Sequence, residues 1–293
     1  MFPTLLKIGP ITLHSYGLMI ALGFLAALYG AQRDAQKRGI NPQTIQSMAF
    51  WALLAGLAGT RLLHIAMFPG GYSWRDPIGW IAIWRGGLVF QGALPVAGIY
   101  VYLACRHHKI PFWRVVDCVM PYIPLAHALG RVGCFLNGCC YGARTNLPWG
   151  ICFPRVPWSF SEPAKGSPVY LDHCQRYSEL SMTHDHWSYP VHPTQLYGVI
   201  GLLILCGILL FWRNRRPLFD GFTMPVYFML YAVGRFLVEF LRGDHNPIVF
   251  NAISQQQLFS IFYFAFGAGL LWVLHQHEKR KTPPNSSPVR QSK

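Results

Sequence analysis

Residues 130–142 read GRVGCFLNGCCYG, and they follow an apolar run interrupted by prolines, MPYIPLAHAL, at residues 120–129. The stretch places one permanent cation, Arg131, among glycines and thiols at the end of a segment that is apolar enough to cross a membrane. A charge within a span is expensive and usually faces the interior of a helix bundle or a water-filled cavity. The stretch therefore indicates a polytopic membrane protein with a functional site near the end of a span.

The composition agrees with a membrane protein. Of the 293 residues, 52% are hydrophobic and only 12% are charged, against about 25% charged in a soluble domain. The net charge of +14 would by itself suggest nucleic acid, but the apolar content argues against that class. Most of the basic residues fall in short loops, where they set topology and meet anionic headgroups. We therefore expect membrane lipids as partners and no nucleic acid.

The apolar segments predict an all-α polytopic membrane protein with seven transmembrane helices. A span needs roughly 20 mostly apolar residues. Seven stretches come near this length: residues 16–32, 47–68, 86–104, 115–133, 195–212, 219–240 and 254–275. The fourth is the weakest because Pro121 and Pro124 interrupt it, which a span tolerates where neighbouring helices or water satisfy the freed carbonyls.

Basic residues give the expected orientation. They gather after the first, third, fifth and seventh spans, which the positive-inside rule assigns to the cytoplasm. The N-terminus then lies outside, and the polar segment of about 134–194 forms a small periplasmic head domain. We expect the transmembrane domain, including this segment, to cover residues 1–275. Residues 276–293 are polar and proline-rich at their end and are expected to form a disordered cytoplasmic tail.

Three arginines are candidates for binding an anion. In GRFLVEFLRGD, residues 234–244, Arg235, Glu239 and Arg242 are spaced i, i+4 and i+7 and share one helical face. Glu239 can pair with either arginine, which leaves one positive charge in excess. Arg131 has no acidic neighbour in the sequence. If the spans bundle, these arginines converge on one cavity, and arginine is well matched to phosphate. An anionic lipid headgroup is the predicted ligand, with a purely structural ion pair as the alternative.

Other polar side chains at span ends admit two interpretations each. His14 and Tyr16 in HSYGLMI, residues 14–20, suit either an interfacial aromatic belt or a site. Arg61, with His64 in the same predicted span, either faces the bundle interior or extends its head outwards. Gln91 lies in the glycine-containing stretch IWRGGLVFQGALP at residues 83–95. Either this stretch belongs to a site, where Gln91 needs a polar partner at membrane depth, or its glycines serve helix packing.

The segment YPVHPTQLYG, residues 189–198, precedes the fifth predicted span. Its prolines favour an extended backbone just before the helix, and Thr194 can cap the N-terminus of the helix. A structural cap does not explain His192 and Gln195.

Three fates remain open for the cysteines. Cys134, Cys139 and Cys140, with Cys152 and Cys174 downstream, all fall on the predicted outer side, where disulfides are permitted. Zinc sites favour CxxC-like spacing, which the adjacent pair fits poorly. Packing as small apolar residues is the commonest fate of free cysteine.

Five motifs resemble those of the prolipoprotein diacylglyceryl transferases. They are HSYGLMI, the GG-containing stretch of the third span, GRVGCFLNGCCYG, HPTQLY and GRFLVEFLRGD, in the family's order across residues 14–260. The resemblance implies a seven-span enzyme of the bacterial inner membrane that needs no metal or organic cofactor. It implies transfer of the diacylglyceryl group of phosphatidylglycerol to the lipobox cysteine of a preprolipoprotein signal peptide. The products are a thioether and glycerol 1-phosphate.

The resemblance also assigns roles to residues. Arg131 matches an arginine that contacts phosphatidylglycerol, Arg235 matches an essential arginine, and Tyr16 and Asn137 match functional positions. We predict catalytic residues and phosphatidylglycerol-binding residues, and no metal ligand. The predicted catalytic residues are Arg235, Glu239, Tyr16 and His14; the predicted binding residues are Arg131, Asn137, Gly142, Gln91, Arg242 and His192.

The sequence departs from the family pattern at two informative positions. Many members have a histidine, proposed as the base, where this chain has Gln91, and glutamine cannot take a proton at neutral pH. His14, His64 and His192 are candidates for the base, on the grounds of residue type only. Gly198 replaces a glutamate common after HPTQLY. The alternatives are therefore a non-catalytic lipid-binding paralogue, an anion or lipid transporter, and a membrane thiol–disulfide protein. The lack of an evident internal repeat counts against a transporter.

Overall fold

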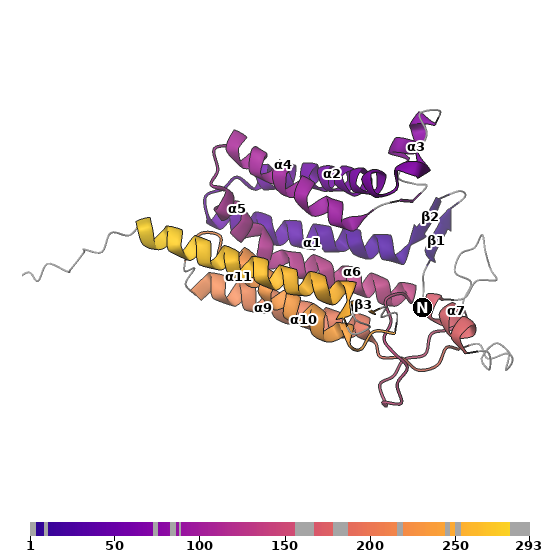
Figure 1. Ribbon diagram of the computed structural model, residues 1–293. Helices are drawn as coiled ribbons and strands as arrows, with labels where there is room; N and C mark the ends of the chain where they lie inside the picture. Colours follow the sequence, from indigo (N-terminus) through magenta and orange to yellow (C-terminus); the bar gives the residue numbers. More distant parts are fainter. Residues whose placement is uncertain are drawn as a thin grey trace, which may run out of the picture. The chain divides into compact units, whose positions relative to one another are not determined.

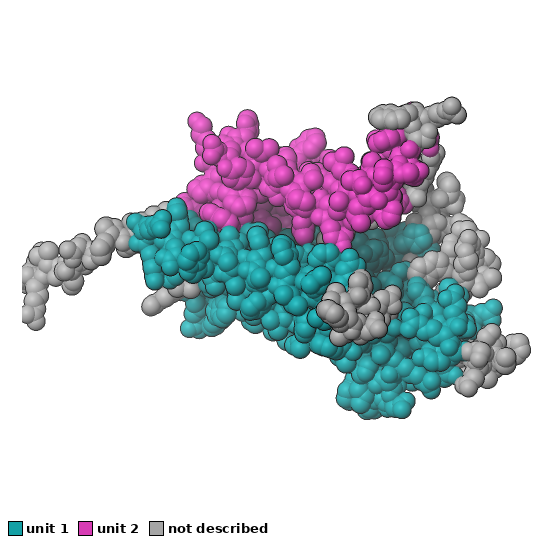
Figure 2. Space-filling model, viewed as in Figure 1, with its two compact units in different colours: residues 1–27, 120–293 teal, residues 28–119 magenta. Residues whose placement is uncertain are grey.

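The computed structural model describes residues 4–8, 11–72, 76–82, 86–87, 89–155, 167–177, 187–215, 219–243, 247–249 and 253–281. The chain divides into two compact units, which Figure 2 colours separately. The first unit comprises residues 1–27 and 120–293, and the second comprises residues 28–119. Helices make up most of both units (Figure 1).

The first unit is built on long helices. They are α1 (Ser15–Lys37), of which residues 28–37 belong to the second unit, α6 (Ile123–Asn137), α9 (Thr194–Arg215), α10 (Thr223–Glu239) and α11 (Gln255–Lys281). Within this unit α9 packs against both α6 and α10, and α10 packs against α11. Two antiparallel hairpins complete it: β1 (Thr4–Ile8) with β2 (Ile11–His14), and β3 (Pro247–Val249) with β4 (Ile253–Ser254).

Helix α6 owes both of its ends to sequence features seen in the opening stretch. A 3₁₀ turn, η4 (Met120–Tyr122), precedes it at Pro121, because proline lacks the N–H that a continuous helix needs. Gly138 ends the helix in the left-handed conformation, with φ 70°, which glycine adopts without steric cost. The amide of Cys139 then donates to the carbonyl of Cys134 at 3.1 Å. The chain thus turns back over the last turn of α6.

The second unit contains α2 (Pro42–Met67), η1 (Pro69–Gly71), α3 (Pro77–Ile81), η3 (Phe90–Gly92), α4 (Ala93–His107) and α5 (Phe112–Val119). Asn41 caps α2, since its Oδ1 accepts from the amide of Gln43 at 2.9 Å. Helices α2 and α4 pack together. Gly59 and Gly92 meet so closely that the backbone of each occupies the space of a Cβ on the other.

Arg61 is a structural cation in this unit. It is 8% exposed and donates to the carbonyls of Trp80 at 3.1 Å, Gly86 at 2.7 Å, Gly87 at 2.9 Å, and Gly79. Gly86 and Gly87 have φ of 83° and 74°, conformations that glycine permits. Arg61 is therefore buried beneath the segment that joins α2 to α4, and its guanidinium is satisfied by backbone carbonyls of that segment. The predicted third span also begins too early, because residues 86–87 and 89–92 are not α-helical and α4 starts at Ala93.

Five helices are long and apolar enough to cross a membrane, which identifies a multi-pass membrane protein. They are Ser15–Lys37, Pro42–Met67, Phe112–Asn137, Thr194–Arg215 and Gln255–Arg280. The stretches predicted at 86–104 and 219–240 contain α4 and α10, which are shorter, with 15 and 17 residues. Helix α11 continues to Lys281, past the predicted boundary at residue 275. The rest of the predicted tail, residues 282–293, lies outside the described residues.

The polar segment between α6 and α9 has a small core of its own. Tyr141, Phe153, Val169 and Val191 pack together, and Val169 lies on the short helix α7 (Pro168–Arg176). His173 of α7 is buried beside them, and its Nδ1 accepts from the amide of Tyr189 at 3.2 Å. Burial lowers the pKa of His173, since a low-dielectric environment disfavours the charged imidazolium. Within this segment, residues 156–166 and 178–186 lie outside the described part of the chain.

Candidate active site

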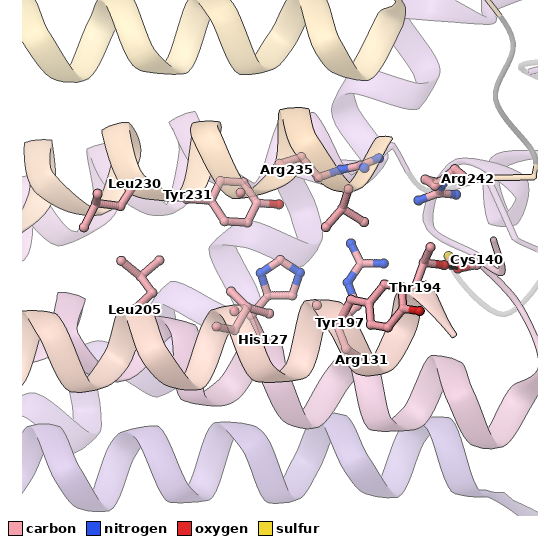
Figure 3. A pocket seen from close by; sticks show the side chains of 15 residues that line it. His127, Arg131, Cys140, Thr194, Tyr197, Leu205, Leu230, Tyr231, Arg235 and Arg242 are labelled. Carbon is pink, nitrogen blue, oxygen red and sulfur yellow. Dashed lines mark hydrogen bonds between the residues drawn. The ribbon is translucent and has the colours of Figure 1, made fainter. Parts of the chain in front are cut away.

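Helices α6, α9 and α10 of the first unit line a pocket of about 620 Å³, including its open mouth. One end is cationic, because the side chains of Arg131, Arg235 and Arg242 meet there (Figure 3). Leu205 and Leu230 line the other end (Figure 3). The pocket can therefore receive a ligand with an anionic head and an apolar tail.

The predicted charged face of α10 is confirmed as a set of ion pairs. Arg235 Nη1 lies 2.5 Å from Glu239 Oε2, one helical turn away, and Arg242 Nε lies 3.9 Å from the same oxygen. Glu239 is only 3% exposed. A buried carboxylate of this kind fixes the geometry of its arginines while neutralising one of their charges.

A second set of contacts holds Glu239 from behind. Ser254 Oγ donates to Glu239 Oε1 at 2.8 Å. Ser254 also caps α11 reciprocally with Gln257: the amide of Gln257 donates to Ser254 Oγ at 3.2 Å, and the amide of Ser254 donates to Gln257 Oε1 at 3.0 Å. Both residues are buried. The S-x-x-Q pattern before the last apolar segment is the sequence signal of this capping box, and the contact between Ser254 and Glu239 was not predicted.

Arg131 differs from the two arginines of the α10 face. Among the described residues, no carboxylate lies within 4 Å of its guanidinium. Gly198 lies beside its side chain, where an added Cβ would be 3.7 Å from Arg131 Cδ. With Arg235 and Arg242 sharing Glu239, the described part of this pocket end carries three guanidinium groups and one carboxylate. The excess is positive, as predicted.

Three further residues that were not predicted also line the pocket: His127, Tyr197 and Tyr231. His127 stands one helical turn before Arg131, and its ring centroid is 5.5 Å from that of Tyr231. The i, i+4 spacing of His127 and Arg131 was the available signal, since it places both on one face of α6.

Gly142 has a structural role, because it contacts both the segment before α9, at His192, and the segment after α10, at Arg242. Its amide donates to the carbonyl of His192 at 3.0 Å, and it forms an isolated antiparallel bridge with Arg242. An added Cβ would be 2.5 Å from His192 Cβ. His192 Nδ1 lies 3.4 Å from the hydroxyl of Tyr197, a pocket residue. Gly142 and His192 are not among the described residues that line the pocket, but they contact residues that are.

Four further predicted residues are not among the described pocket-lining residues. Tyr16, 41% exposed, lies at the start of α1 against Gly133 of α6, and Asn137 is the last residue of α6. His14 is exposed at the end of β2. Gln91 is exposed in η3 of the second unit.

The start of α9 holds the chain that follows α6. Thr194 Oγ1 donates to the carbonyl of Cys140 and Gln195 Nε2 to that of Cys139, both at 2.8 Å. This accounts for the glutamine that a simple cap did not explain. The sulfur atoms of Cys134, Cys139 and Cys140 all lie within 4.8 Å of one another, and all eight cysteines of the chain are free.

The thiol of Cys140 also lines the pocket. Hydrogen bonds from the thiols of Cys134 and Cys139, with the charges of Arg242 and Arg131 behind them, hold the pKa of Cys140 below its ordinary value.

Comparison with known proteins gives a consistent match along the chain. The family described as LGT, prolipoprotein diacylglyceryl transferase, matches residues 3–273. A phosphatidylglycerol–prolipoprotein diacylglyceryl transferase of Clostridium tetani is 33% identical over 267 residues, covering 91% of this chain and 95% of the relative. Another from Synechococcus elongatus is 32% identical over 280 residues, covering 92% and 87%. The chain therefore belongs to the prolipoprotein diacylglyceryl transferase family.

Proposed function

We propose that the chain transfers the diacylglyceryl group of phosphatidylglycerol to the thiol of the lipobox cysteine in bacterial preprolipoproteins. The observation that carries this function at the level of the site is the pocket with arginines at one end and an apolar wall at the other. We also propose that the chain lies in the bacterial inner membrane and crosses it seven times, with the N-terminus outside. In this topology residues 134–194 form a periplasmic head domain. Basic loops on one side of the predicted spans support this topology.

The lipid phosphate binds at the cationic end. Arg131, with no carboxylate partner among the described residues, offers its guanidinium to the phosphate oxygens, and guanidinium suits phosphate bidentately. Arg235 and Arg242 add donors whose positions Glu239 fixes. An acyl chain extends along the leucine-lined end, where burial of apolar surface contributes about 25 cal/mol per Å².

The transfer itself is a substitution at a glycerol carbon. The substrate thiol must act as a thiolate, since thiolate is the nucleophile. Its sulfur forms the new C–S bond as the C–O bond to the phosphate breaks, and the phosphate keeps the electron pair. Preorganised arginine donors stabilise the charge that develops there. His127 lines the pocket and is the imidazole that we assign to accept the thiol proton, a role that Gln91 cannot take.

Tyr16 and Asn137 are proposed to contact the incoming signal peptide. Tyr16 of α1 packs on Gly133 of α6. Asn137 stands one turn after Gly133 and shares its face of α6, so Asn137 lies on the side of α6 that Tyr16 contacts. For His14, which is exposed two residues before Tyr16, we propose a peripheral contact with the same peptide.

A reconstituted assay tests the function. Purified chain is incubated with phosphatidylglycerol and a lipobox peptide, and the peptide mass and released glycerol 1-phosphate are measured. We expect thioether product from the wild type, loss of product in Arg131→Gln and Arg235→Gln, and full activity in Arg106→Gln, an exposed arginine of α4 outside the pocket. Lipid binding without product identifies a non-catalytic lipid-binding paralogue and refutes the proposal.

A further inference from the structure

Three thiols stand at the cationic end of the pocket, and the proposed reaction does not use them. The sulfur atoms of Cys134, Cys139 and Cys140 lie within 4.8 Å of one another. Cys134 is buried, whereas the other two are half-buried. Cys140 lines the pocket at the end where Arg131 and Arg242 meet (Figure 3). The cluster is therefore assembled in advance, with one thiol open to the lipid site.

The backbone holds Cys140 in a conformation that costs free energy. Its φ is 59°, in the left-handed region that residues other than glycine rarely adopt. Such strain persists where the surroundings over-determine the backbone, and it gathers at functional sites. Here the buried side chains of Thr194 and Gln195 donate to the carbonyls of Cys140 and Cys139. Packing of small apolar side chains needs no such anchors, so the arrangement indicates a chemical role for the thiols.

The three thiols have different surroundings, and these favour one pair for a disulfide. The thiol of Cys139 donates to the carbonyl of Cys134 at 3.8 Å. A bond between the adjacent Cys139 and Cys140 would strain the planar peptide unit between them. Cys140 is open to a reagent in the pocket, whereas Cys134 is buried and is not among the described pocket-lining residues. Cys140 is thus the thiol that reacts first, and Cys134 is the thiol that completes the disulfide.

Cys140 also competes for the charges that we assign to the lipid phosphate. Hydrogen bonds from the two neighbouring thiols, followed by the charges of Arg242 and Arg131, hold the pKa of Cys140 below its ordinary value. The reduced chain therefore carries a thiolate beside the guanidinium groups. This anion competes with a phosphate for the same donors. A disulfide is neutral, so its formation removes the competitor.

We propose that Cys134 and Cys140 form a disulfide by exchange with a small disulfide, and that this bond strengthens the binding of a lipid phosphate at Arg131 and Arg242. The disulfide is the fate that we select from the three that the sequence leaves open. The disulfide site stands on the cluster alone. Its effect on lipid binding rests on the proposed function, and its place outside the cytoplasm, where disulfides are permitted, rests on the proposed topology.

The exchange has two steps. The thiolate of Cys140 attacks one sulfur of a small disulfide such as oxidised glutathione, which forms a mixed disulfide and releases one thiolate. The sulfur of Cys134 then attacks the Cys140 sulfur of the mixed disulfide, and the second small thiol leaves with the proton of Cys134. The two cysteines lose two electrons, and the small disulfide gains them.

Lipid binding and disulfide formation are thermodynamically linked. If the disulfide raises the affinity for the lipid, bound lipid must favour the disulfide by the same factor, because coupling between binding free energies is reciprocal. We expect a coupling of the usual size, about 5- to 150-fold. A disulfide with a purely structural role would leave the affinity for the lipid unchanged.

A glutathione titration tests the disulfide without relying on activity. The full-length chain in detergent carries Cys152→Ser and Cys174→Ser, which remove the other two cysteines predicted on the outer side. It is equilibrated in buffers of oxidised and reduced glutathione, and its free thiols are then alkylated and counted by mass spectrometry. We expect the oxidised chain to lose two alkylation sites within the cluster and to recover them on reduction.

Serine variants assign the pair, because all three cysteines of the cluster fall on one tryptic peptide, residues 132–144. We expect the disulfide in Cys139→Ser and not in Cys134→Ser or Cys140→Ser. Cys134→Ser should instead accumulate the mixed disulfide of Cys140 with glutathione. Circular dichroism and gel filtration verify that each variant is folded.

Lipid titrations test the effect on binding. Short-chain phosphatidylglycerol, and a short-chain diacylglycerol that lacks the phosphate, are titrated into the oxidised and the reduced chain. We expect phosphatidylglycerol to bind the oxidised chain more tightly by the factor given above, and diacylglycerol to bind both equally. Cys140→Ser, which has no thiolate, should bind phosphatidylglycerol in either buffer as tightly as the oxidised chain. Saturating phosphatidylglycerol should shift the glutathione midpoint towards the disulfide by the same factor.

Three results would overturn the proposal: thiols that stay reduced in excess oxidised glutathione, a disulfide that persists in Cys134→Ser, or a disulfide that leaves the affinity for phosphatidylglycerol unchanged. If phosphatidylglycerol binds Arg131→Gln as tightly as the unmodified site, binding at the arginines is wrong, and the proposed function fails while the disulfide stands. If the oxidised chain binds the lipid as expected but yields no thioether, the transfer is wrong and the redox control of lipid binding stands.

Discussion

Replacing Ser254 with alanine should lower activity although Ser254 is not among the described pocket-lining residues. Its hydroxyl donates to Glu239 Oε1 at 2.8 Å, and Glu239 Oε2 pairs with Arg235 at 2.5 Å. Without that donor, the buried carboxylate loses one of the contacts that fix its orientation. Arg235, which we propose to stabilise the departing phosphate, then loses its alignment. Ser254 is therefore a positioning residue that acts through Glu239.

The size of the effect follows from the type of bond. A hydrogen bond to a charged group is worth about 1.5–3 kcal/mol. If the whole loss falls on the transition state, kcat/KM drops by roughly 10- to 150-fold, since about 1.4 kcal/mol corresponds to a factor of ten. Ser254 also caps α11, and removing a cap costs about 1 kcal/mol of stability. The two consequences must therefore be separated by experiment.

Gln257 provides the matched control. Gln257→Ala removes the reciprocal half of the capping box but leaves the bond from Ser254 to Glu239 in place. We expect this variant to lower the unfolding temperature with little change in kcat/KM, whereas Ser254→Ala lowers both and Ser254→Thr, which keeps the hydroxyl, restores activity. Thioether formation and thermal unfolding in detergent are measured for all three variants. Equal losses of kcat/KM in Ser254→Ala and Gln257→Ala would refute the positioning role and leave only helix capping.

Four further outcomes are expected. Arg131→Gln should reduce transferase kcat by about 10²- to 10³-fold, as for loss of one preorganised donor, and Arg131→Lys should recover only part of it because lysine cannot bind phosphate bidentately. Gly142→Ala should cost about 1–3 kcal/mol in denaturant unfolding through the overlap with His192. Arg61→Gln should destabilise the second unit, detected as faster amide exchange around Gly79 and Gly86–Gly87, whose carbonyls lose their donor. His173 has a folded pKa below its unfolded value of 6.5, so the unfolded chain takes up the proton first, and stability should fall as pH drops below about 6.5; His173→Gln should flatten that slope in urea titrations.

The sequence was most informative where function requires charge in an apolar setting. The i, i+4, i+7 spacing on one helix was sufficient to predict that Glu239 would pair with the arginines of α10. The excess positive charge at the pocket followed from the scarcity of acidic residues nearby. Both inferences use only the periodicity of one helix and the signs of nearby charges. Neither depends on how the rest of the chain folds.

Contacts between distant segments could not be predicted in this way. The hydroxyl of Ser254 reaches Glu239 only because α11 packs on α10. The link between Gln195 and Cys139 depends on α9 starting beside the end of α6. The proximity of the three cysteines is of the same kind, because Gly138 folds Cys139 and Cys140 back over α6 and brings their sulfur atoms within 4.8 Å of that of Cys134.

The contrast between Arg61 and Arg131 shows what decides the role of an arginine in a membrane segment. Both looked alike in the sequence, as cations within apolar spans. Arg61 is satisfied by backbone carbonyls because the glycine pair at 86–87 turns its carbonyls towards the guanidinium. Around Arg131, the neighbouring chain is α-helical, and the carbonyls of a helix interior are already used within the helix. An arginine surrounded by helices must find a carboxylate or a ligand, and the described residues near Arg131 provide no carboxylate within 4 Å. Regular secondary structure around an arginine in a membrane segment is therefore the feature that favours a ligand-binding role, whereas an adjacent glycine turn favours a structural one.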